Sequence, residues 1–78
     1  MAIITKITRS NENYTMRGGL TFCEAQYNEY MYYGNKYVRI QTFGSDARQV
    51  KGKQSQVIHI NKETAIQLIN FLKKSFDL

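Results

Sequence analysis

A two-residue turn signal at the centre of the chain constrains its fold more than any other feature. Gly34-Asn35 separates two runs rich in aromatic and β-branched residues, Leu20 to Tyr33 and Lys36 to Phe43. Gly in the first turn position favours a type II′ turn, whose twist matches that of two antiparallel strands. The sequence therefore predicts a β-hairpin, and Lys36 to Phe43 is its clearest strand.

A turn at this place determines which side chains share a face of the hairpin. Antiparallel pairing would set Tyr32 opposite Tyr37 and Tyr30 opposite Arg39, with alternate residues on opposite faces. The aliphatic face then carries Met31, Val38, Ile40 and Thr42. The aromatic face carries Tyr30, Tyr32, Tyr37, Arg39, Gln41 and Phe43.

Three further segments have the composition of strands. Ala2 to Arg9 is β-branched at most positions, and Tyr14 to Arg17 leads into Gly18-Gly19, a second signal for a hairpin turn. Gln54 to Ile60 is the last β-prone segment of the chain. We therefore expect a sheet of four or five strands.

Two segments allow more than one interpretation. Leu20 to Tyr33 is long for one strand, so we expect a bulge or bend between Gln26 and Glu29, with a helix over Phe22 to Tyr32 as the alternative. Ser45 to Lys53 is polar and predicts a mobile hairpin loop. Its cations are Arg48, Lys51 and Lys53, which either contact phosphates or simply form a solvated tip.

The carboxy-terminal segment has the pattern of an amphipathic helix. Asn61 is a good N-cap, so we expect the helix to begin at Lys62. Its apolar stripe consists of Ala65, Leu68, Ile69, Leu72 and Phe76. Ile66 and Phe71 flank this stripe on opposite sides, and they either wrap the edge of the sheet or form a dimer interface.

The length of the chain limits it to one domain, residues 1–78. A chain of 78 residues buries a smaller share of its surface than a large domain does, and pairing with a second copy can supply the missing burial. The predicted fold class is α+β, with an antiparallel meander sheet and one carboxy-terminal helix packed on one face. We expect a homodimer.

The aromatic face is the candidate binding site. Eleven Lys and Arg against six Asp and Glu give a net charge of +5, which favours anionic partners. Bases stack on aromatic rings, and Arg adds cation–π and phosphate contacts. The sequence thus predicts a binding protein for single-stranded DNA or RNA, in transcription or replication, in which the four rings stack bases and Arg39 and the loop cations contact phosphates.

Two alternatives assign the aromatic face to other roles. It could be buried in a homodimer or under the amino-terminal strand. It could also bind a protein, because Tyr and Arg dominate protein interfaces as well. In that case the chain would be a small accessory or inhibitory protein of a phage or mobile element that binds an acidic host protein.

The sequence has no pattern typical of a catalytic or metal site. His59 is the only histidine, and we expect a structural role for it on a strand, directed away from Ile58 and Ile60. Cys23 is the only cysteine, which predicts a small buried thiol and a cytoplasmic location. We therefore expect no enzyme activity, no metal or other cofactor, and no membrane segment.

The second half of the chain resembles a known family in the order and spacing of its elements. The residues that carry the resemblance are Tyr37 to Gly44, Arg48, Gly52-Lys53, Gln56 to Ile60, Asn61, Ala65, Leu68 and Leu72. They are similar to the carboxy-terminal domain of the transcriptional positive cofactor four family. The resemblance implies a curved antiparallel sheet that binds single-stranded DNA, followed by one helix that dimerises.

Overall fold

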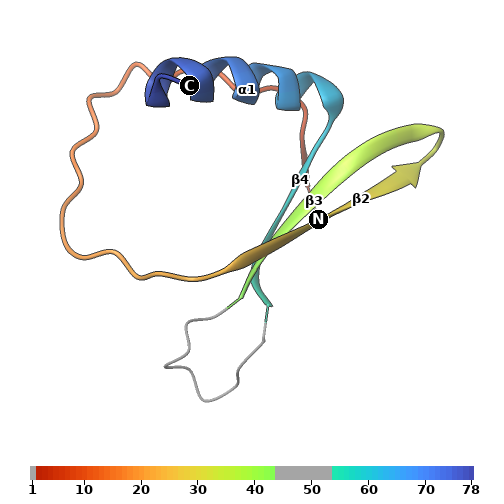
Figure 1. Ribbon diagram of the computed structural model, residues 1–78, viewed down its shortest axis with the longest axis horizontal. Helices are drawn as coiled ribbons and strands as arrows, with labels where there is room; N and C mark the ends of the chain where they lie inside the picture. Colours follow the sequence, from red (N-terminus) through yellow and green to blue (C-terminus); the bar gives the residue numbers. More distant parts are fainter. Residues whose placement is uncertain (1, 44–53) are drawn as a thin grey trace.

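The computed structural model describes residues 2–43 and 54–78 and has an α+β architecture (Figure 1). A four-stranded sheet precedes one carboxy-terminal helix. The elements are β1 (Ile3–Ile4), β2 (Ala25–Tyr32), β3 (Asn35–Phe43), β4 (Gln54–Ile60) and α1 (Lys62–Phe76). The structure confirms the strand predicted at residues 54–60 and the helix predicted from Lys62 onward.

The sheet is mixed, so the predicted antiparallel meander is wrong for one strand. Its order is β1-β4-β3-β2, and β2, β3 and β4 are antiparallel neighbours. β1 pairs with β4 in parallel, through Ile3 with His59 and Ile4 with Ile60. The first strand of the chain therefore forms the edge next to the last strand and does not continue into β2.

The hairpin between β2 and β3 is confirmed, but its turn lies one residue earlier than predicted. Tyr33 and Gly34 occupy the turn with φ values of 48° and 79°. Positive φ at both turn residues is typical of type I′, not of the predicted type II′. The Tyr33 ring packs edge-on against the Tyr32 ring, with centroids 4.5 Å apart, and this contact accompanies a backbone conformation that few non-glycine residues adopt.

The earlier turn changes the pairing without exchanging the faces. Tyr30 lies opposite Tyr37, and Met31 lies opposite Lys36. Each residue of β2 is thus paired two positions away from its predicted partner, and side chains alternate with a period of two. The aromatic and aliphatic faces consequently keep their predicted members.

β2 is a regular strand, so the predicted bend and the alternative helix are both wrong. Its residues pair one by one with β3 from Ala25 to Tyr32. The irregularity falls in β4 instead, where Gln54 pairs with Phe43 and Gln56 with Thr42. Ser55 is the extra residue of this bulge.

The amino-terminal segment forms much less sheet than predicted. β1 has two residues, and residues 5–24 contain neither strand nor helix, so the predicted hairpin at Gly18-Gly19 is not formed. The helix supplies the polar partners of this segment. The Thr64 hydroxyl donates to the Ile4 carbonyl (2.7 Å), and the Ile7 amide donates to Gln67 Oε1 (2.9 Å). These side-chain bonds replace the strand pairing that β-branched composition suggested.

The helix is capped at both ends, by the predicted Asn61 at its start and by Asp77 at its end. Asn61 Oδ1 accepts a hydrogen bond from the Thr64 amide at 2.9 Å, which confirms Asn61 as the N-cap. At the other end Asp77 has φ 56°, and the Leu78 amide donates to the Lys73 carbonyl at 3.0 Å. Local side-chain and backbone bonds therefore fix where α1 begins and ends.

Little of the chain is buried. Among the residues whose side chains the structure describes, the buried ones are Ile60, His59 and Thr64, at 9%, 7% and 1% exposure. The helix begins at the end of β4 and then runs away from the sheet (Figure 1), so the prediction that it packs on one face of the sheet is wrong. Ile69 and Phe76 on its apolar stripe consequently remain 51% and 69% exposed.

Replacing the N-cap should destabilise the fold measurably. We expect Asn61→Ala to lower the free energy of unfolding by about 1 kcal/mol, because the Thr64 amide loses its acceptor. Asn61→Asp, which keeps an acceptor oxygen, is the control and should cost much less. Urea unfolding at one protein concentration, followed by far-ultraviolet circular dichroism, measures both, and equal stability of the two variants would contradict this role.

Candidate functional site

The aromatic face gathers side chains from three strands. β2 contributes Tyr30 and Tyr32, and β3 contributes Tyr37 and Arg39. The pairing places Tyr30 beside Tyr37 and Arg39 beside His59, which comes from β4. The structure thus brings together the tyrosines and the arginine predicted for this face, and it adds a histidine to them.

The three tyrosine rings form one continuous cluster. Tyr30 and Tyr37 stack with centroids 5.7 Å apart and an interplanar angle of 29°. The Tyr32 and Tyr37 rings have centroids 6.4 Å apart and a larger interplanar angle of 62°. Tyr30 and Tyr37 are half-buried, whereas Tyr32 is 54% exposed. The cluster therefore has two rings held by their neighbours and one ring open to a ligand.

His59 anchors the centre of this face. Its Nδ1 lies 2.7 Å from the Tyr30 hydroxyl, and the two rings meet edge-on at 5.6 Å. The predicted orientation of His59, away from Ile58 and Ile60, is confirmed by the strand alternation. Sequence reasoning did not assign His59 to the site, because that assignment requires the register between β3 and β4, which no turn signal specifies.

Arg39 is held along its own strand. Its Nη1 donates to Gln41 Oε1 at 2.6 Å, and both side chains are half-buried. Glu29, an acid of β2, belongs to the opposite face and lies 3.8 Å from Lys36. Within the described parts of β2, β3 and β4, the residues that the pairing assigns to the aromatic face include no acid. The electrostatic character of this face is therefore cationic.

A hollow opens beside the exposed ring. It has a volume of about 410 Å³ and is lined by Ile3, Tyr30, Tyr32 and His59. Ile3 reaches it because β1 extends the edge of the sheet beside β4. The alternative in which the amino-terminal strand covers the aromatic face is therefore wrong, and β1 supplies one wall of the hollow instead.

Other predicted residues have different surroundings. Phe43 is half-buried at the far end of β3, and its amide donates to the Glu24 carbonyl at 3.0 Å. The predicted loop cations Arg48, Lys51 and Lys53 lie outside the described residues. Cys23 is exposed, so the prediction of a buried thiol is wrong. It lies in the segment without strand or helix, where no layer of side chains covers it.

The predicted dimer contacts lie on the helix and are accessible. Ile66 is 49% exposed and Phe71 is 48% exposed. Neither belongs to the aromatic face, which lies on the sheet. Their role in a dimer stays a prediction.

The described residues hold no group of three or more His, Cys, Asp or Glu side chains that could bind a metal ion. In the same part of the chain, no helix has both the length and the apolar character needed to cross a membrane. Comparison with protein-family models, curated proteins and solved structures finds no match.

Removing the Tyr30 hydroxyl tests the anchor of the aromatic face. We expect Tyr30→Phe to lower the free energy of unfolding by about 1–2 kcal/mol, because Nδ1 of the buried His59 loses the partner 2.7 Å away. Tyr32→Phe, a change of the same atoms on the same strand, should have little effect. Chemical denaturation of both variants measures the difference, and equal stabilities would show that the hydrogen bond contributes nothing.

Proposed function

We propose that the aromatic face binds single-stranded nucleic acid without catalysing a reaction. The observation that carries this proposal is the continuous cluster of Tyr30, Tyr32 and Tyr37 beside Arg39, on a face without acids in the described strands. Each base stacked on an aromatic ring contributes roughly 1–3 kcal/mol, and such stacking tolerates any base. The net charge of +5 adds attraction to the phosphate backbone.

The arrangement of the rings suggests how a strand would bind. Tyr32 is the most exposed ring of the cluster, so it would accept a base first, and the hollow beside it has room for a planar group. The bond between Tyr30 and His59 holds the middle of the face in one orientation before any ligand arrives. A preorganised surface loses less side-chain entropy on binding.

The direction of the bound strand would follow β3. Phe43 lies six residues beyond Tyr37, a distance of roughly 20 Å along a strand. Several nucleotides would span the face between these two rings. At the far end of β3 the backbone would reach the loop cations Arg48, Lys51 and Lys53, which we propose as additional phosphate contacts.

A binding assay with matched variants tests the proposal. Fluorescence anisotropy of a short labelled single-stranded oligonucleotide should rise with added protein, and the affinity should fall steeply as salt increases. We expect Tyr37→Ala combined with Arg39→Ala to weaken binding about tenfold or more, because a stacked base and a phosphate contact are both lost. A plot of log affinity against log salt has a negative slope. The loss of one phosphate contact should make this slope less steep by about 0.7.

The matched control removes the same atoms elsewhere. Tyr14→Ala combined with Arg17→Ala deletes one tyrosine ring and one charge from the segment without strand or helix, where both residues are exposed. This variant should bind nearly as well as the original chain. No binding at low salt, or equal losses in the two variants, would refute the proposal. In that event capture of a single acidic protein through Tyr37 and Arg39 would support the protein-binding alternative.

A further inference from the structure

The chain by itself exposes far more surface than a folded domain of its size. Its accessible surface is 7439 Å², whereas folded monomers of 9.1 kDa expose roughly 4,900 Å². Its radius of gyration is 15.1 Å, against roughly 11.5 Å for a compact chain of this length. About 2,500 Å² per chain is therefore available for burial against a partner.

One unpartnered surface is the aliphatic face of the sheet. β4 adds two residues to it, because Ile60 pairs with Val38 and Ile58 pairs with Ile40. Met31 is 62% exposed and Ile58 is 42% exposed on this face. Tyr27, which alternation places on the same side of β2, is 79% exposed. A sheet face of this composition is normally covered by another layer.

The second unpartnered surface is the apolar stripe of α1. Ile69 and Phe76 lie near its centre and are at least half exposed. A helix with one apolar stripe is stable in water when that stripe packs against another element. The stripe and the aliphatic face are thus both apolar, but within one chain they make little contact with each other.

The connection between β4 and α1 prevents the helix from folding back over its own sheet. Asn61 alone joins Ile60 to Lys62, and its side chain caps the helix. The bonds from Thr64 to Ile4 and from Ile7 to Gln67 hold the first turns in that direction. The helix therefore cannot swing round without breaking several hydrogen bonds.

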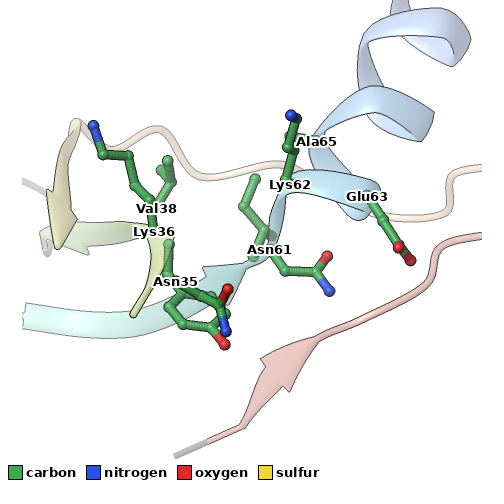
Figure 2. A pocket seen from close by; sticks show the side chains of 9 residues that line it. Asn35, Lys36, Val38, Asn61, Lys62, Glu63 and Ala65 are labelled. Carbon is green, nitrogen blue, oxygen red and sulfur yellow. The ribbon is translucent and has the colours of Figure 1, made fainter. Parts of the chain in front are cut away.

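A cavity remains where the helix leaves the sheet. Figure 2 shows its lining residues, among which Val38 of β3 and Ala65 of α1 lie on opposite sides. Its volume is about 520 Å³, enough for a large side chain from elsewhere. The Lys36 side chain points away from Ala65 and forms an ion pair with Glu29. Lys62 and Glu63, at the start of the helix, also line the cavity.

We propose that a second copy of the chain covers these surfaces by exchanging helices. The apolar stripe of each α1 packs on the aliphatic face of the other copy, around a twofold axis. Each chain has both an apolar stripe and an aliphatic face. A symmetric pair therefore covers the two stripes and the two faces at once. If each chain buried its excess surface of about 2,500 Å², the pair would bury about 5,000 Å² in total, at the upper end of the 2,000–5,000 Å² that obligate homodimers bury.

The exchange assigns particular positions to residues of the helix. Ile69 and Phe76 lie in the middle of the interface, against Met31 and Ile58 of the other copy. Ile66 and Phe71 lie at its rim. The aromatic faces remain on the outer sides of the two sheets, so this inference does not depend on what the aromatic face binds.

The mass in solution gives the first test. Size-exclusion chromatography with light scattering should report about 18 kDa, twice the 9.1 kDa of the chain. Ile69→Glu places a charge in the stripe and should yield monomer or unfolded protein. Asn70→Glu, which puts the same charge outside the stripe, roughly 100° around α1 from Ile69, should stay dimeric. A mass of one chain at all concentrations would overturn the proposal.

Cross-linking tests the exchange itself and does not depend on a disruptive variant. Two variants are made in a Cys23→Ser background. One carries Ile58→Cys, and the other carries Ile69→Cys and is isotope-labelled. The two chains are mixed in denaturant and refolded together. Oxidation should give mainly the disulfide between unlike chains, recognised by its intermediate mass. Disulfides between two Ile69→Cys chains only, or no cross-link, would show that the helices do not lie on the partner's sheet.

Discussion

The end of β4 is the point on which the rest of the structure depends. Ile60 pairs with Val38 on one side and Ile4 on the other, so three strands are joined through one buried residue. Asn61 follows it and caps the helix, and Thr64, the least exposed residue of the described chain, binds back to Ile4. Strand pairing, helix start and amino-terminal docking thus share a few neighbouring residues.

This junction also explains why side chains pack on one another on one face of the sheet but stay exposed on the other. On the aromatic face the Tyr30 ring packs against Tyr37 and His59, and the Tyr30 hydroxyl forms a hydrogen bond with His59 Nδ1. The aliphatic face carries the ion pair of Glu29 and Lys36, but its apolar side chains, among them Met31 and Ile58, remain exposed and need a covering layer. The helix that could supply that layer is directed elsewhere by its cap.

Local signals in the sequence were sufficient for the second half of the fold. Turn residues, alternation and capping act over a few positions. They therefore predicted β3, β4, the N-cap Asn61 and the residues of both sheet faces. The segment that precedes β2 was not predictable in this way. Its β-branched residues suggested strands, but the groups that bind Ile4 and Ile7 are Thr64 and Gln67, sixty residues away. The addition of His59 to the site likewise depends on long-range register.

The type I′ turn at Tyr33-Gly34 has a consequence for how the hairpin can change during evolution. Adding two residues between Tyr33 and Gly34 would lengthen the hairpin by one pair and leave every existing pair in place. Adding one residue while keeping a two-residue turn would shift the pairing by one position, and Tyr30 would no longer share a face with Tyr37. A three-residue loop would absorb that extra residue and keep both surfaces of the sheet.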